Sequence, residues 1–158
     1  MMEAVAIPPF ERVYEAHAGE VLGYLTRMLG RQAAEDAWQE TFLRALRAYP
    51  QLRHGRHLRA WVFTIATRVA LDERRRAKPV PAELPELESL DGRPAFAELA
   101  PWTAELPPTE RAAVVLRYGY DLDYDAIGDA LGSSADAARQ AASSGVRRLR
   151  RTHAADPR

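Results

Sequence analysis

Cationic side chains gather in one part of this chain, between positions 53 and 78. The stretch holds eight cations against two anions, although the whole chain has a formal net charge of +0. The cations are Arg53, Arg56, Arg59, Arg68, Arg74, Arg75, Arg76 and Lys78. Aromatic and hydroxyl side chains lie among them, as a surface that holds phosphates and stacks or hydrogen-bonds bases requires. The stretch predicts a nucleic-acid-binding surface, although arginines that offset the dipole of a solvated helix end give a similar pattern.

A short polar turn is predicted over 50–57, and a helix over the stretch from His54 to Lys78 would separate its side chains into two faces. The packing face carries Leu58, Trp61, Val62, Ile65 and Val69. The other face carries Phe63, Thr64, Thr67, Arg68, Leu71, Arg74 and Arg75. We expect the first face to pack on the protein and the second to be accessible to nucleic acid.

A helix is predicted before this stretch, from about Gln32 to Tyr49, and Pro50 ends it. Its expected buried stripe is Trp38, Phe42, Ala45 and Leu46. Its opposite side carries Asp36, Gln39, Glu40, Leu43, Arg44 and Arg47. An apolar centre with a charged rim is typical of a protein-docking face, although a single exposed leucine needs no explanation.

The first predicted helix runs from Phe10 to Leu29, because apolar residues recur there at three- and four-residue steps before Gly30. His17 lies in the apolar row and is interpreted as a packed, hydrogen-bonded histidine. The pair His54 and His57 lies among arginines with no carboxylate or cysteine nearby, so we predict no metal site.

Two runs of residues now support a resemblance. AEDAWQETFLRALR at 34–47, followed by LRAWVFTIATRVALDERRR at 58–76, resembles the second conserved region of bacterial RNA polymerase sigma factors, of the extracytoplasmic-function (ECF) type. The resemblance implies that the first run docks on the clamp coiled coil of the polymerase. It also implies that the second run, with the turn before it, captures the melted non-template strand of the promoter. Arg68 departs from the family, in which many members carry Asn at this place.

These implied roles give two sets of candidate residues. The polymerase-binding set is Asp36, Gln39, Glu40, Leu43 and Arg47. The promoter-binding set in this part of the chain is Arg53, Arg56, Arg59, Phe63, Thr64, Thr67, Arg68, Arg74 and Arg75.

Residues 79–104 differ in composition from both flanks. Counting the sequence, residues 79–110 carry one Lys/Arg and seven Asp/Glu, and five prolines fall between 79 and 101. We predict a flexible acidic, Pro-rich linker, with a short helix near Phe96 to Leu99. It separates a domain at 1–78 from a second at 105–158, so the predicted fold class is all-α with two small helical domains.

The second domain contains a predicted helix-turn-helix. A helix from Leu106 to Tyr118 begins at prolines, and a second covers Tyr124 to Leu131. A turn at 132–134 leads to a last helix over 135–151, with Ser134 as its N-cap. This part resembles the fourth region of sigma factors, which reads the upstream promoter element. Arg139 and Gln140 are the long polar side chains in the first half of the last helix, so we expect base contacts from them. Arg147 comes too late for base edges, and we expect it to contact phosphate.

The first half of that last helix is rich in alanine. Its alanines are Ala135, Ala137, Ala138, Ala141 and Ala142. Since base reading needs side chains that span the major groove, we predict weak or relaxed reading of the upstream element. Ala138 and Ala142 stand where the family usually has large apolar residues, which predicts a loosely packed helix-turn-helix.

Composition excludes several functional classes. The chain has 158 residues and no cysteine, so disulfides and zinc-thiolate sites are excluded. It lacks a signal-peptide pattern and any stretch near the roughly 20 apolar residues of a membrane span. We therefore expect a cytoplasmic protein without membrane insertion. No nucleophile and base set or paired carboxylates are recognisable, so we expect no enzyme, cofactor, metal or small-molecule substrate.

The sequence favours an ECF-type sigma factor that binds core RNA polymerase, opens promoter DNA and initiates transcription. Members of this family are commonly restrained by an anti-sigma factor, which makes such a protein a further expected partner. The alternative is a sigma-like regulatory interaction protein that binds polymerase or another partner without selecting promoters. A dimeric helix-turn-helix repressor would need a self-association surface that the sequence does not display.

Overall fold

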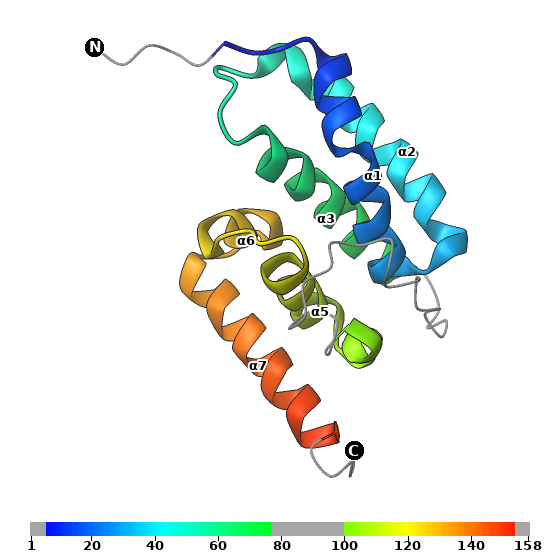
Figure 1. Ribbon diagram of the computed structural model, residues 1–158, viewed down its shortest axis with the longest axis vertical. Coiled ribbons are helices and arrows are strands. Elements are labelled where there is room, and N and C mark those ends of the chain that lie inside the picture. The colour runs from blue at the N-terminus through cyan, green and yellow to red at the C-terminus, as the bar shows by residue number, and fades with distance from the viewer. Residues whose placement is uncertain (1–5, 77–99, 154–158) are drawn as a thin grey trace.

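The computed structural model describes residues 6–76 and 100–153, and helices dominate both segments. The first segment contains α1 (Phe10–Leu29), α2 (Arg31–Ala48), the 3-10 helix η1 (Tyr49–Gln51) and α3 (Leu58–Arg76). The second contains η3 (Ala100–Glu105), α5 (Pro108–Val114), the π-helical turn η4 (Val115–Gly119), α6 (Tyr124–Leu131) and α7 (Ala135–His153). Figure 1 shows the two groups one above the other, with α6 beside α3. The predicted all-α class is confirmed for the described residues.

Chain breakers set the helix boundaries in the first group. Gly30, with φ of 84°, turns the chain between α1 and α2, and its N–H donates to the carbonyl of Thr26 at 2.8 Å. Helix α2 ends at Ala48, before the predicted end at Tyr49, and Pro50 lies in the 3-10 turn η1 that follows. The turn predicted over 50–57 is confirmed, since η1 and a loop precede α3 there, and His57 has φ of 57°. Helix α3 accordingly begins at Leu58 and not at His54.

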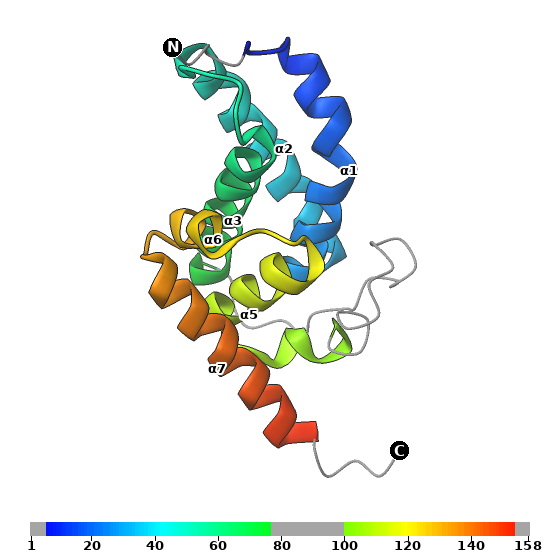
Figure 2. The same cartoon turned by 60° about the vertical axis from the view of Figure 1, so that its left-hand side comes forward.

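Helix α3 lies at the centre of the molecule, against α1 and α2 on one side and α6 and α5 on the other (Figure 2). Its buried residues are Val62, Phe63, Ala66, Thr67, Val69 and Ala70. The prediction that Phe63 and Thr67 lie on an accessible face is wrong, because both side chains have 0% exposure. The buried side of α3 thus takes residues from both predicted faces, because Tyr24 of α1 and Tyr120 of the second group pack against Phe63.

The helix-turn-helix is built from local hydrogen bonds. The Asp123 side chain caps α6 by accepting from the N–H of Ala126 at 2.8 Å, and Gly132, at φ of 71°, ends that helix. Ser134 caps α7, since its hydroxyl oxygen accepts from the N–H of Ala137 at 3.0 Å. The predicted N-cap is therefore confirmed.

The buried stripe of α7 is made of small residues at its start. Ala138 and Ala142 are fully buried. Near the middle of the helix, a Cβ added at Gly145 would come within 2.7 Å of the Val114 Cγ2 atom. Small side chains thus let α7 approach its neighbours closely. Loose packing of the helix-turn-helix stays a prediction. The small buried side chains of α7 nevertheless lie close to the neighbouring helices.

Arg111 joins the start of the second group to the end of α1. It is 2% exposed, and its guanidinium donates to the backbone carbonyls of Thr103, Ala104, Leu106 and Met28. Burial, with a contribution from the charge of Arg74, lowers the pKa of Arg111 to about 10. The residue remains a cation at neutral pH and holds the two helical groups together.

Most of the predicted linker at 79–104, including the helix expected from Phe96 to Leu99, lies outside the described residues. Its last residues, from Ala100, belong to η3. In the described part of the chain, none of the helices combines the length and the apolar character that crossing a bilayer requires.

Candidate polymerase and nucleic-acid interfaces

The outer face of α2 carries the predicted docking residues. Asp36, Gln39, Leu43 and Arg47 are exposed, and Glu40 is half-exposed. A hydrogen bond from Arg44 at 2.8 Å lowers the pKa of Glu40, which stays ionised at neutral pH. The structure thus brings all five residues to solvent on one helix.

Leu46 extends the apolar centre of this face. It was expected to be buried, but it is 51% exposed, beside Leu43 at 47%. The buried stripe of α2 runs through Ala34, Ala37, Thr41, Phe42 and Ala45 instead. Leu46 directly follows Ala45, the last residue of this stripe, and points to solvent. Two leucines, and not only Leu43, are therefore exposed among charged residues.

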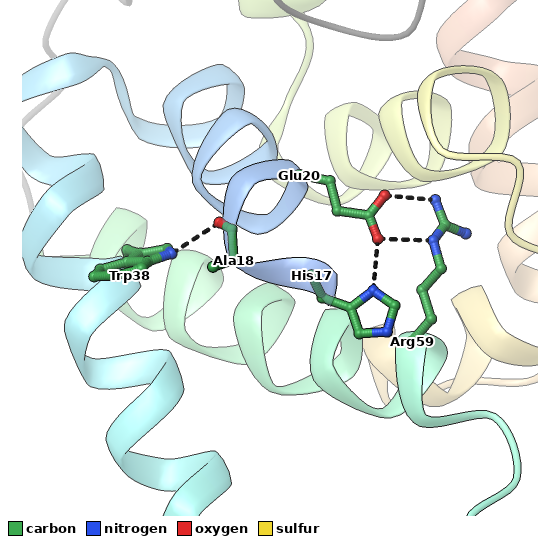
Figure 3. A network of polar contacts seen from close by, with 5 residues as sticks. All are labelled: His17, Ala18, Glu20, Trp38 and Arg59. Carbon is green, nitrogen blue, oxygen red and sulfur yellow. Dashed lines mark hydrogen bonds and ion pairs between the residues drawn. The ribbon is translucent and has the colours of Figure 1, made fainter. Parts of the chain in front are cut away.

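The back of α2 is fixed to α1. The indole N–H of Trp38 donates to the carbonyl of Ala18 at 3.0 Å, as Figure 3 shows. Its ring also packs with Tyr14 and Phe42, at centroid distances of 5.7 and 5.4 Å. These contacts fix α2 to α1 on the side opposite the predicted docking residues.

The predicted DNA contact Arg59 is partly exposed and is paired with a carboxylate of α1. Its Nε and NH2 atoms donate to the two Glu20 carboxylate oxygens at 2.9 and 3.2 Å, and His17 Nδ1 lies 2.9 Å from Glu20 Oε1 (Figure 3). Burial by itself would raise the pKa of Glu20, but the hydrogen bonds and charges of His17 and Arg59 outweigh it, so this pKa is lowered. Arg59 therefore anchors α3 to α1, and His17 is a half-buried, hydrogen-bonded residue.

A buried aromatic cluster with one polar contact joins α1, α3 and the second group of helices. The Tyr24 hydroxyl lies 2.8 Å from Thr67 Oγ1, and the Phe63 ring packs on Tyr24 and Tyr120 at 5.5 and 5.0 Å. Burial raises the pKa of Tyr24, so its hydroxyl stays protonated. Phe63 and Thr67 thus hold α1, α3 and the residue after η4 together.

The remaining predicted cations of this region reach solvent to different degrees. Arg53, Arg68 and Arg75 are exposed, whereas Arg56 and Arg74 are half-exposed. Arg75 NH2 lies 3.1 Å from Asp72 Oδ1, an exposed pair that costs little to break. Thr64 is half-buried, and its hydroxyl donates to the carbonyl of Ala60 at 2.9 Å.

Several of these residues, but neither Arg74 nor Arg75, form one wall of a cleft of about 1010 Å³. The loop before α3 and α3 itself contribute Arg53, Arg56, Arg59, Thr64 and Arg68, together with His54 and His57. The opposite wall comes from the segment that leads into α6 and from α6, and carries Asp121, Asp123, Asp125 and Asp129. The cleft therefore has one cationic and one anionic wall.

The predicted base-reading residues of α7 are exposed. Arg139 NH1 lies 2.8 Å from Asp136 Oδ1, and its guanidinium carbon lies 5.0 Å from the Tyr124 ring centroid. Gln140 is exposed, and Arg147 donates to the Ser144 hydroxyl oxygen at 3.3 Å. Arg139 would have to leave Asp136 to contact a base.

Sequence reasoning missed the partners of these residues. Glu20 contacts Arg59, Tyr24 contacts Thr67, and Tyr120 contacts Phe63, in each case across a long stretch of the chain. Arg111 likewise reaches Met28, 83 residues earlier. The acidic residues from 121 to 129 offered a signal, since four aspartates fall within nine positions. Among residues 6–76 and 100–153, no group of three or more histidines and carboxylates is arranged to hold a metal ion.

Comparison with known proteins gives two family matches in chain order. Sigma-70 region 2 matches residues 13–80, and Sigma-70 region 4 matches residues 102–151. The chain is 32% identical over 151 residues to the RNA polymerase sigma factor CarQ of Myxococcus xanthus, covering 89% of this chain and 87% of CarQ. It is 34% identical over 163 residues to the ECF RNA polymerase sigma factor SigE of Mycolicibacterium smegmatis, covering 94% of this chain but 63% of SigE.

Solved structures share the helical arrangement. The sigma factor RpoE of Bartonella quintana, in complex with the anti-sigma factor NepR, has a TM-score of 0.73 at 18% identity, covering 94% of this chain and 98% of RpoE. CnrH, in complex with the cytosolic domain of CnrY, has a TM-score of 0.68 at 23% identity, covering 94% and 89%. At these identities the likeness establishes the fold alone.

Proposed function

The chain belongs to the extracytoplasmic-function group of RNA polymerase sigma factors, and from this we propose that it binds core RNA polymerase and directs promoter recognition, strand opening and transcription initiation. The observation that carries the proposal is the presence of two different surfaces on one rigid bundle. An apolar patch with a charged rim lies on α2, and a cationic surface lies on α3 and the loop before it. A factor with both surfaces can place a DNA strand at a fixed position relative to a large protein.

The α2 face is the proposed polymerase contact. Its centre is Leu43 and Leu46, which are surrounded by Asp36, Gln39, Glu40 and Arg47. Removing the two leucines from water would supply the hydrophobic part of the binding free energy. The charged rim would set the orientation of the two proteins and their association rate. The contacts of Trp38 with α1 keep this helix in place, so little ordering cost is expected on binding.

The loop from Arg53 to His57 and the exposed side of α3 are the proposed contact for the melted promoter strand. Arg53, Arg56, Arg68, Arg74 and Arg75 would neutralise phosphates, which makes binding strongly salt-dependent.

Partly buried aromatic and hydroxyl groups lie beside these cations. Trp61 and Thr64 line the same cleft, where stacking on an unpaired base and a hydrogen bond to it are available. Arg59 contributes in a different way, by fixing the start of α3 through Glu20.

The last helix, α7, is proposed to contribute weakly to sequence selection. Arg139 and Gln140 are the long side chains in its first half, and Arg139 is held by Asp136. Arg147 lies later on the helix, where it would bind phosphate without selecting a base. Most promoter specificity would then fall on the first group of helices.

This assignment makes the protein a transcription initiation factor that acts through the polymerase and not an enzyme by itself. Its proposed location is the cytoplasm, where polymerase and promoter DNA are found. A proteinaceous inhibitor is a further proposed partner, since RpoE of similar fold is bound to an anti-sigma factor.

The second candidate is a regulator that binds polymerase without selecting promoters. The alanine-rich first half of α7 favours it, because few side chains there can reach base edges.

Reconstitution with core polymerase on a library of genomic DNA fragments tests both candidates. A sigma factor gives transcripts that start downstream of shared sequence elements. The regulator candidate predicts polymerase binding without new start sites, and that result would replace the first proposal.

A further inference from the structure

The short segment before α1 lies against the loop that is proposed to bind the melted strand. A Cβ added at Gly55, in this loop, would lie 3.0 Å from the carbonyl carbon of Ala6 and closer still to its oxygen. It would also lie 3.3 Å from the Cα atom of Ile7. Figures 1 and 2 both place the start of the described chain beside this loop. Two segments that are far apart in the sequence are therefore in contact through their backbones.

Glycine at position 55 is required by this close approach and not by its backbone conformation. The described glycines with left-handed φ are Gly30 and Gly132, and Gly55 is not one of them. An added Cβ would meet main-chain atoms of Ala6 and Ile7, which cannot rotate away as the end of a side chain can. Only a residue without a side chain lets the loop and the segment lie this close.

Tyr49 makes a second connection between the segment and the loop. Its hydroxyl donates to the carbonyl of Pro8. Its ring packs on Phe10 and Trp61, at centroid distances of 5.2 and 6.1 Å. Pro9 leads the segment into α1 with φ of -57° and ψ of 145°, the extended conformation of a stiff proline-rich chain. A stiff segment that is bonded to Tyr49 can hold the adjacent loop in place.

The segment supports the loop from the side that does not line the cleft. His54 and Arg56, on either side of Gly55 in the sequence, line the cleft, whereas Gly55 and residues 6–9 do not. A loop that is held from behind loses less conformational freedom when a ligand binds to its front. Contacts of the segment can therefore favour strand binding without touching the strand.

Resting on the function proposed above, we propose that residues 6–9 are a positioning segment for the strand-binding loop, and that they act through Gly55 and Tyr49. The positioning segment keeps the loop in the conformation in which Arg53 and Arg56 line the cleft. Both arginines are then in place before the melted strand arrives, so their phosphate contacts are not offset by the cost of ordering the loop. Loss of these contacts weakens strand capture and leaves polymerase binding unchanged.

Two variants of the full chain disturb the positioning segment in different ways. Gly55→Ala adds a methyl group where there is no room, and Tyr49→Phe removes the hydrogen bond to Pro8 without adding atoms. Each variant is combined with core polymerase on a promoter found with the genomic library, and unpaired thymines are measured by permanganate reactivity. We expect about two- to tenfold fewer open complexes at equal holoenzyme concentration, the effect of about one hydrogen bond, with unchanged affinity for core polymerase. Normal promoter opening by both variants would overturn the proposal.

The matched controls make the same substitutions on α1. Gly19→Ala adds a methyl group in open space at an exposed position, and Tyr14→Phe removes a hydroxyl from an exposed tyrosine. Neither control should reduce promoter opening, and a loss equal to that of the test variants would overturn the proposal. Far-UV circular dichroism checks the fold, and if Gly55→Ala does not fold, Tyr49→Phe decides the outcome.

A further readout tests whether the positioning segment acts through the loop arginines. In an Arg53→Gln/Arg56→Gln chain, at a salt concentration where this chain still opens the promoter, Tyr49→Phe should cause no additional loss. An additional loss as large as in the wild-type background would show that Tyr49 acts by another route, and would overturn the proposal.

The motion of the loop is measured in the free chain, independently of transcription. NMR order parameters of the backbone amides at 53–57 should fall in Tyr49→Phe and Gly55→Ala, and unchanged values would refute a positioning role. Failure of the wild type to open any promoter would remove the sigma-factor function, and the proposal with it. Opening by the wild type together with equal opening by both variants would remove the positioning role alone.

Discussion

Thr67 offers a direct test of the packing that closes α3 against its neighbours. Its hydroxyl donates to the carbonyl of Phe63 at 2.8 Å, so the Tyr24 hydroxyl, 2.8 Å from Thr67 Oγ1, must be the donor in their contact. Both side chains have 0% exposure. Thr67→Val keeps the branched shape and the helix propensity but removes the acceptor of Tyr24.

The expected cost follows from the group left without a partner. A buried hydroxyl that loses its acceptor costs about 1–3 kcal/mol of the free energy of unfolding. For a chain of this size, each kcal/mol lowers Tm by about 2–4 °C. Tyr24→Phe alone removes one hydrogen bond without stranding Thr67, which still bonds Phe63, and should cost about 0.5–1.5 kcal/mol.

The double variant Tyr24→Phe/Thr67→Val completes a mutant cycle. Since both polar partners are then absent, it should be less destabilised than the sum of the two single variants, by about 1 kcal/mol. Urea unfolding followed by far-UV circular dichroism measures the four free energies of unfolding. Simple additivity would refute the assignment of a specific hydrogen bond between these residues.

The same variants separate packing from strand binding. Thr67→Val should leave the affinity for single-stranded DNA unchanged under conditions where the variant is folded. If Thr67→Val kept its stability but lost this affinity, Thr67 would be a DNA contact and the packing argument would be wrong.

Three other predictions concern docking, pH and promoter selection. Asp36→Lys/Glu40→Lys should abolish polymerase-dependent transcription with the circular dichroism spectrum unchanged, whereas Glu15→Lys on α1 should have little effect; full activity of the first variant would exclude the α2 face. Because the pKa of Glu20 is lowered, its contribution to stability is present above the ordinary value of 4.5 and is lost as pH falls through the lowered value. The Tm difference between wild type and Glu20→Gln should therefore shrink on acidification, and a constant difference would count against the ion pair with Arg59. Changing only upstream-element bases should weaken holoenzyme binding slightly, and a steep loss would show that α7 reads them.

Helix positions were accessible from the sequence because their signals are local. Gly30, Pro50 and Ser134 mark boundaries through backbone conformation or capping, and the structure places helix ends at or near each of them. The solvent exposure of the predicted docking residues on α2 was also predictable, since all of them lie on one helix. Leu46 was misplaced because a period of 3.6 residues leaves the edge of a stripe ambiguous.

The second face of α3 could not be predicted in the same way. Phe63 and Thr67 are paired with Tyr24 and Tyr120, which come from segments 39 or more residues away. Periodicity describes one helix and carries no information about what covers it. The role of Arg59 was missed for the same reason, because its partner Glu20 lies 39 residues earlier.

The bonds of Arg111 bear on how sequence comparison can detect coupling between the halves of this protein. Its acceptors at positions 28, 103, 104 and 106 are all main-chain carbonyls, which every amino acid provides. Side chains at these four positions can therefore vary among homologues without any compensating change at 111. A search for correlated substitutions would find no partner for this arginine, although it spans 83 residues to Met28 and ties both halves of the molecule together.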